Sequence, residues 1–134
     1  MRRWGSAMLA VIVAAIAIWL GVHALLKRAR AAAYEQELRS YTDALSPGTT
    51  RKRVEDELRT RGALYERVYG FDRTNAYADL VKIGSESAPW YCNHNNIYIK
   101  FQFDAAEPIP DGTSDSDSDI LRSIEVTPWL QECL

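Results

Sequence analysis

The sequence predicts an α+β protein: an N-terminal transmembrane helix extended into a juxtamembrane helix, a second short helix, and an antiparallel strand meander covered by the helices. Three observations predict it. Residues 4–26 contain no Asp, Glu, Lys or Arg. Apolar residues then recur at helical spacing on both sides of a break at residues 46–49. After residue 62 the pattern changes to the alternation of half-buried strands, so the helices and strands form separate layers of one small domain.

The charges are distributed unevenly along the 134 residues. Residues 1–30 hold five of the 16 Lys and Arg residues and no acid, so residues 31–134 keep eleven cations against 18 acids, a formal charge of −7. An acidic domain is a poor partner for nucleic acid, whose binding rests on cations that replace counterions. We therefore expect no nucleic-acid partner, and we assign the basic residues beside the apolar run to the lipid headgroups of a bilayer.

Residues 7–26 form the predicted transmembrane helix, preceded by a tail of residues 1–6. Twenty residues without a formal charge make a helix of about 30 Å, which matches the hydrocarbon core of a bilayer. A cleaved signal peptide is the alternative, with Arg2 and Arg3 as its basic start, but the length of the apolar run favours a retained signal anchor. No Cys directly follows the run, which excludes a lipoprotein.

The orientation of this anchor is nearly balanced by cation count. Arg2 and Arg3 precede the apolar run, and Lys27, Arg28 and Arg30 follow it. Two cysteines in an acidic, aromatic domain favour a cytoplasmic N-terminus with the domain outside. The prediction is a single-pass protein of the bacterial inner membrane with a periplasmic globular domain.

The juxtamembrane helix is predicted for residues 27–46, where Tyr34, Leu38, Tyr41 and Leu45 form one apolar stripe. The stripe is expected to pack on the chain's own domain, residues 47–134. A coiled coil with a second copy is the alternative, which makes homo-oligomerisation through this helix a second hypothesis, although coiled coils normally need more heptads.

The second helix is predicted for residues 51–61, between the break and Gly62, which suits a left-handed C-cap. Thr50 is expected to cap the first turn with its hydroxyl, and Val54 and Leu58 to form the buried face. The basic first turn, residues 51–53, opposes the helix dipole. It is interpreted as a solvated turn paired with the acids at residues 55–57, or else as a contact for headgroups or an acidic partner.

Four strands are predicted, at residues 64–70, 77–83, 97–103 and 121–127. The third is the clearest, because Ile97, Ile99, Phe101 and Phe103 alternate with more polar residues. Pro128 is expected to end the fourth strand, since proline cannot donate to a sheet ladder.

Cys92 and Cys133 are predicted to form a disulfide if the domain lies outside the cytoplasm, with two reduced thiols as the alternative. The loop of about forty residues would gain on the order of 3–4 kcal/mol of stability from the bridge in the chain-entropy model. No metal site is expected. His94 adds only one ligand to these cysteines, and the run Asp115, Asp117 and Asp119 lacks the Gly and Glu of an EF-hand loop.

Trp90, Tyr91 and Tyr98 form an aromatic cluster with two interpretations. They are either an exposed interaction surface, since Trp and Tyr anchor interfaces, or part of the core of a small domain. The sequence has no phosphate-binding glycine loop, serine elbow or paired carboxylates. We therefore predict that the protein is not an enzyme and has no cofactor.

The segment Gly48-Thr49-Thr50-Arg51-Lys52-Arg53-Val54 resembles the Gly-x-Thr-x-x-x-Val pattern that opens the second helix of the SmpA/OmlA family. That resemblance implies two helices packed on an antiparallel sheet, an architecture shared with β-lactamase-inhibitor-like domains. This chain lacks the lipobox cysteine of that family and carries a spanning helix instead.

The chain is also similar to small uncharacterised bacterial membrane proteins. The likeness lies in four stretches: residues 47–55, 78–84, 89–92 and 133–134. It implies the same plan of an anchor and one domain. The functional expectation is an envelope protein-interaction or scaffold module with another envelope protein as partner, or alternatively an inhibitor-like domain that occludes a partner's site.

Overall fold

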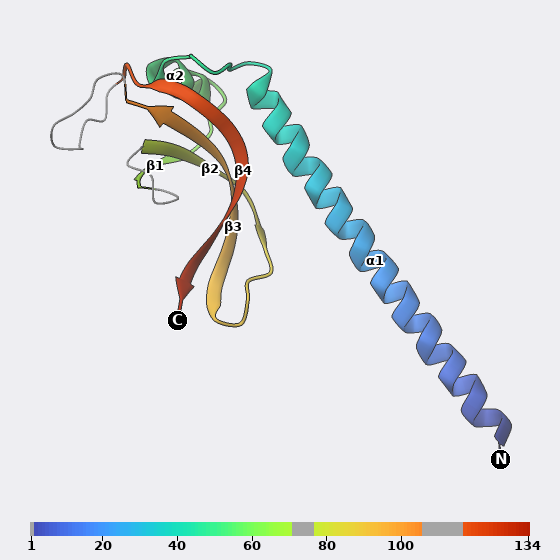
Figure 1. Ribbon diagram of the computed structural model, residues 1–134. Coiled ribbons are helices and arrows are strands. Elements are labelled where there is room, and N and C mark those ends of the chain that lie inside the picture. The colour runs from blue at the N-terminus through green and yellow to red at the C-terminus, as the bar shows by residue number, and fades with distance from the viewer. Residues whose placement is uncertain (1, 71–76, 106–116) are drawn as a thin grey trace. The chain divides into compact units, whose positions relative to one another are not determined.

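The computed structural model describes residues 2–70, 77–105 and 117–134, with side chains from Met8 onward. The chain divides into two units, Met1–Glu35 and Gln36–Leu134. Two helices precede four strands, which confirms the predicted α+β class (Figure 1). The elements are α1 (Arg2–Thr42), α2 (Arg51–Thr60), β1 (Tyr65–Tyr69), β2 (Tyr77–Glu86), β3 (Cys92–Asp104) and β4 (Ile120–Cys133).

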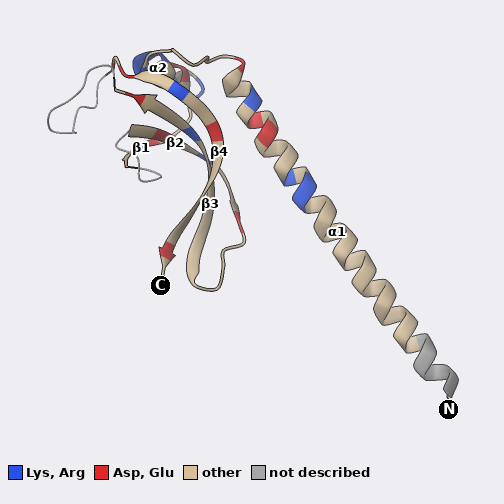
Figure 2. Cartoon of the chain, viewed as in Figure 1, with Lys and Arg blue, Asp and Glu red and all other residues tan. Residues whose placement is uncertain are grey.

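The first unit contains the N-terminal part of α1, and the same helix continues without a break into the second unit. Its stretch from Met8 to Thr42 is long and apolar enough to cross a membrane. The most apolar part of this stretch has a mean hydropathy of 2.5 and contains no buried residue. Figure 2 shows the uncharged stretch of α1 followed by charged residues towards its C-terminal end. The predicted spanning helix is therefore present as one exposed apolar helix.

The C-terminal turns of α1 belong to the globular unit. Tyr41 and Leu45 are both buried, and the Tyr41 ring meets the Phe101 ring of β3 edge to face, with ring centroids 5.3 Å apart. Arg61 reaches back from the end of α2 and donates to the carbonyl oxygen of Ser40 at 2.9 Å. This end of the predicted apolar stripe thus packs on the chain's own domain.

The first turn of α2 is held by the chain that leads into β4, which differs from the predicted capping. Thr50 has the extended backbone of an N-cap, but its hydroxyl makes no capping hydrogen bond. Instead, the N–H groups of Arg51 and Lys52 donate to the carbonyl oxygens of Asp119 and Asp117, at 2.7 and 3.0 Å. Because a helix leaves its first N–H groups without partners inside the helix, carbonyls from another segment can replace the side-chain cap.

The other end of α2 follows the prediction. Gly62 has φ = 68°, and the N–H of Ala63 donates to the carbonyl oxygen of Leu58 at 2.9 Å, which closes the helix. Val54 and Leu58 are fully buried, as expected for the inward face of this helix.

The four strands form one antiparallel sheet in the order β1-β2-β3-β4, a meander in which each strand pairs with its neighbour in sequence. The register places Val81, Ile99 and Val126 side by side, and it places Asp79, Phe101 and Ile124 side by side in the next inward row. Partner residues in a ladder point to the same face of the sheet. Both rows therefore face the layer formed by the helices.

The main hydrophobic core lies between this face and the helices. Its buried residues come from both helical segments, the inter-helix turn and three strands: Tyr41, Leu45, Val54, Leu58, Val81, Ile99, Phe101, Phe103 and Leu121. A second, smaller cluster lies on the opposite face of the sheet and consists of Ala78, Leu80 and Tyr98, with Val68 and Trp129 packed against it.

The prediction that Pro128 ends the fourth strand is wrong, because β4 continues through it to Cys133. Pro128 pairs in register with Ile97, and β4 is an edge strand. An edge strand has N–H groups that point to solvent, so a proline there sacrifices no ladder hydrogen bond. As a result β3 and β4 extend together well beyond the hydrophobic core.

Candidate functional site

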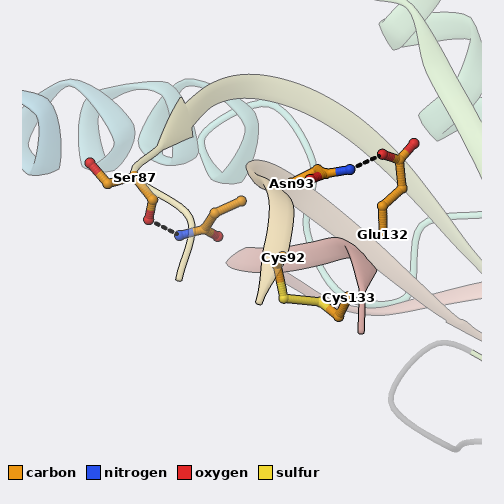
Figure 3. The surroundings of a disulfide bond; sticks show 6 residues. Ser87, Cys92, Asn93, Glu132 and Cys133 are labelled. Carbon is orange, nitrogen blue, oxygen red and sulfur yellow. Dashed lines mark hydrogen bonds between the residues drawn. A yellow bond between two sulfur atoms is a disulfide. The ribbon is translucent and has the colours of Figure 1, made fainter. Parts of the chain in front are cut away.

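The far end of the sheet is closed by the predicted disulfide. Cys92 begins β3, Cys133 ends β4, and the two residues lie directly opposite each other in the ladder with an S–S distance of 2.01 Å (Figure 3). Cys92 is buried, whereas Cys133 is exposed. The bridge spans 41 positions of sequence, close to the loop length expected from the sequence.

Hydrogen bonds around the bridge tie the β2–β3 connection to the end of β4. The N–H of Leu134 donates to the carbonyl oxygen of Tyr91 at 2.8 Å, and the N–H of Cys92 donates to the carbonyl oxygen of Pro89 at 3.0 Å. The side-chain amide of Asn93 donates to the Glu132 carboxylate at 2.8 Å (Figure 3). The backbone from Pro89 to Cys92 is thereby fixed from two sides.

Trp90 and Tyr91 lie on this fixed segment, and we call this pair the aromatic tip. Trp90 is 91% exposed and Tyr91 is 41% exposed. Their rings meet edge to face at 88°, with centroids 5.8 Å apart. A large apolar side chain on an ordered backbone gains more free energy on binding than a mobile one, because less conformational entropy is lost. These two residues therefore have the exposure and order of an interface anchor.

Tyr98, the third residue of the predicted surface, lies elsewhere and is only 7% exposed. It packs in the second cluster, where its ring lies 5.7 Å from that of Trp129. Tyr98 lies six residues after Cys92, a distance of about 20 Å along β3. The sequence placed the three aromatic residues together, but the extended strand separates them, so Tyr98 belongs to the core and not to the aromatic tip.

His94, the third possible metal ligand beside the two cysteines, lies in β3. It is exposed, and its Nε2 lies 3.8 Å from an oxygen of Glu132. Among the residues that the structure describes, no group of three His, Cys, Asp or Glu residues is placed to hold a metal ion. Of the acidic run considered for calcium, Asp115 lies outside the described residues, Asp117 is exposed, and Asp119 is buried.

The sequence analysis missed a cluster of buried charges around Arg51. The Arg51 side chain has no exposed surface, and its guanidinium contacts three carboxylates: Asp79 at 2.5 Å, Glu55 at 3.3 Å and Asp119 at 3.7 Å. We call these four residues the buried ionic cluster. They join α2 to β2 and to the segment before β4, so the cluster connects three parts of the domain.

Burial changes the protonation of Asp79 within the buried ionic cluster. It raises the pKa of Asp79 to about 6, although the positive charge of Arg51 acts in the opposite direction. One oxygen of Asp79 accepts from Arg51, while the other is buried without a hydrogen-bond partner among the described residues. Since a carboxylate oxygen without a donor is poorly stabilised, both observations favour the neutral acid.

Two signals in the sequence point to this cluster. Asp79 alternates with Val81 on the inward face of β2, where an unpaired acid is unfavourable. Arg51 lies three residues before Val54 and seven before Leu58, a spacing that places it on the buried face of α2. The basic first turn was interpreted as solvated or as a ligand contact, and for Arg51 both interpretations are wrong because its side chain is completely buried.

An open depression of about 240 Å³ lies near the second cluster. Its lining is Leu64, Tyr65, Glu66, Leu80, Lys82 and Tyr98. The Tyr65 hydroxyl there is already hydrogen-bonded to Arg59 at 3.3 Å. The depression lacks a His, Cys or Ser that would serve as a nucleophile or a base near neutral pH.

No protein-family model, curated protein or solved structure matches this chain. The order of two helices and an antiparallel sheet agrees with the architecture that the resemblance to the SmpA/OmlA family implied. Membership of that family stays a prediction.

Proposed function

We propose that this protein is a membrane-anchored protein-binding module whose contact surface is the aromatic tip. The observation that carries the proposal is Trp90, which is 91% exposed on a backbone segment fixed by a disulfide and three hydrogen bonds. Single exposed apolar side chains are common on soluble proteins, but Trp90 and Tyr91 are two exposed aromatic side chains in mutual contact, which form a small apolar patch. Trp and Tyr are enriched among the anchors of protein interfaces, so this exposed pair on a hydrogen-bonded segment supports a protein partner.

The tip suits a protein partner better than a small molecule. Small-molecule sites are concave and enclose most of their ligand, whereas Trp90 projects outward. A central Trp in a protein interface typically contributes about 2–4 kcal/mol of binding free energy. A tip with one such anchor and a tyrosine beside it gives enough affinity for a partner already concentrated at the same membrane.

The membrane location supports this interpretation. The apolar helix supplies the anchor, and Lys27, Arg28 and Arg30 follow its apolar stretch, where anionic headgroups would meet them. We infer that the globular unit is periplasmic, because disulfides form and persist outside the cytoplasm. In this proposal the protein carries out no catalysis and acts as an interaction or scaffold module of the bacterial envelope.

An inhibitor-like role is the second candidate. One feature favours it: the aromatic tip lies beside a disulfide and apart from the main hydrophobic core. A rigid segment of this kind can enter a partner's site and block it. Inhibition and scaffolding use the same contact surface. They differ in whether the partner's activity falls when the tip is bound.

Site-specific photo-cross-linking in intact cells tests the proposal. A photoreactive phenylalanine derivative placed at position 90 of the full chain should give one discrete cross-linked product. The same derivative at position 64 is the matched control, because Leu64 is also 91% exposed but lies outside the aromatic tip. Equal products at both positions, or none at position 90, would contradict the proposed contact surface.

A further inference from the structure

The disulfide lies at the margin of the hydrophobic interior, because Cys92 is buried, at 8% exposed, whereas Cys133 is exposed. Neither Cys92 nor Cys133 belongs to either hydrophobic cluster. The nearest β3 residue of the main cluster is Ile99, seven residues and about 23 Å along the strand from Cys92. We therefore expect the main cluster to keep its packing contacts whether or not the bridge is closed.

The end of the sheet depends much more on the bridge. The pairing between β2 and β3 stops at Glu86 and Asn95, so residues 92–94 pair with β4 alone. A two-stranded ribbon without a covering layer is only marginally stable in water. The covalent link between Cys92 and Cys133 is consequently the strongest connection that holds this ribbon closed.

The aromatic tip is attached directly to that ribbon. Tyr91 precedes Cys92, and its carbonyl oxygen accepts a hydrogen bond from Leu134, the neighbour of Cys133. Asn93, on the other side of Cys92, is bonded to Glu132. Both bonds join the same two strand ends as the bridge, so separation of those ends breaks them together and releases Trp90 from its fixed position.

We propose that the Cys92–Cys133 disulfide is a redox switch for the aromatic tip. A dithiol reductant that opens the bridge disorders the tip while the core stays folded, and reoxidation restores it. This regulation rests on the proposed function, because it is the binding surface that is switched.

The chemistry is a two-electron exchange. A thiolate of the dithiol attacks the sulfur of the exposed Cys133 and forms a mixed disulfide, and Cys92 leaves as a thiolate that takes a proton. The second thiolate of the dithiol then displaces Cys133, which is protonated in turn. The dithiol becomes a disulfide, and two electrons and two protons have passed to the cysteine pair.

Hydrogen exchange of the full chain in lipid nanodiscs tests the switch, with dithiothreitol as the dithiol and iodoacetamide to block the freed thiols. We expect amides in residues 90–95 and 129–134 to exchange about tenfold faster, or more, after reduction. Amides of residues 99–103 should change less than about twofold. Unchanged exchange at the tip would overturn the proposal, and so would loss of protection throughout the core.

Two variants complete the test. The double variant Cys92→Ser, Cys133→Ser should show the fast exchange of the reduced protein with or without dithiothreitol. If this variant does not fold, wild-type protein that is reduced after folding gives the same comparison. Trp90→Ala should keep the slow pattern of the oxidised protein, because it removes the anchor but not the bridge.

Cross-linking from position 90 separates failure of the switch from failure of the proposed function. Equal cross-linking before and after reduction overturns the switch and leaves the binding surface intact. Absence of any product in both states overturns the proposed function, and the exchange difference then decides independently whether the bridge orders the tip.

Discussion

The guanidinium of Arg51 on α2 donates a hydrogen bond of 2.5 Å to the carboxylate of Asp79 on β2, and both side chains are completely buried. The faces of the Tyr77 and Phe103 rings lie against the same guanidinium, at 5.3 and 5.0 Å from their centroids. This contact connects a helix to the strand beneath it, inside the buried ionic cluster that Glu55 and Asp119 complete. The docking of α2 therefore combines apolar packing with a buried ionic contact, and removal of one partner of that contact is costly in a low-dielectric environment.

Replacement of Arg51 by Ala should lower the free energy of unfolding by about 3–5 kcal/mol, because three buried carboxylates would lose their shared cation. Denaturant unfolding of the full chain, followed by near-ultraviolet circular dichroism, measures the change. Lys52→Ala is the matched control, since Lys52 is the next residue of the same turn but is exposed, and it should change stability by less than about 0.5 kcal/mol. Equal losses of unfolding free energy in the two variants would show that the buried contact of Arg51 stabilises the domain no more than the exposed Lys52 does.

The stability of the domain should depend on pH through Asp79. Its pKa is about 6 in the folded protein and about 3.9 in an unfolded chain, so the folded state binds the proton more tightly. The stabilisation from this group is fully present below pH 4 and is lost as the pH rises through 6. The loss amounts to about 2–3 kcal/mol by pH 7.

Comparison with Asp79→Asn isolates that contribution from those of the other acids. Asn keeps a side-chain oxygen for Arg51 but does not ionise, so the stability of the variant relative to wild type should rise between pH 4 and pH 7. Thermal unfolding of both proteins across this range provides the measurement. A variant that becomes relatively less stable as the pH rises would show that the ionised form of Asp79 is favoured in the folded state.

The two residues of the aromatic tip should differ from Tyr98 in their effect on folding. Tyr98→Ala should cost about 3–5 kcal/mol of stability, because it empties the centre of the second cluster. Trp90→Ala should leave the melting temperature nearly unchanged and should remove binding of the cross-linked partner. If Trp90→Ala unfolded the protein, Trp90 would be a core residue in solution.

Thiol labelling of intact cells should place the globular unit outside the cytoplasm. A membrane-impermeant maleimide is expected to label Cys92 and Cys133 only after an external reductant has opened their disulfide. The double variant Cys92→Ser, Cys133→Ser provides the unlabelled control. Labelling that requires cell lysis, and needs no reductant, would put the domain in the cytoplasm with free thiols.

The elements that local periodicity determines were predictable from the sequence. The apolar run, the stripe that ends in Tyr41 and Leu45, and the alternation around Ile99 each follow a repeat of 3.6 or 2 residues, and each forms the expected element. The disulfide was predictable on other grounds, because the chain has only two cysteines and its domain was expected outside the cytoplasm.

Features set by contacts between distant segments were not predictable in this way. The burial of Arg51 depends on Asp79 and Asp119, which lie 28 and 68 positions further along the chain. The continuation of β4 through Pro128 depends on its place at the edge of the sheet, and the separation of Tyr98 from Trp90 depends on where β3 begins. Local sequence patterns contain none of this information.

The edge position of Pro128 also matters for copies of this protein that share a membrane. Confinement of an anchored chain to a bilayer raises its local concentration, and an uninterrupted fourteen-residue edge strand would then pair with the same strand of a neighbouring copy. Pro128 offers no N–H for such a pairing, and Glu132, with φ = 53°, bends the strand away from the extended form near its end. The strand that carries one half of the disulfide is thus protected against edge-to-edge pairing with another copy.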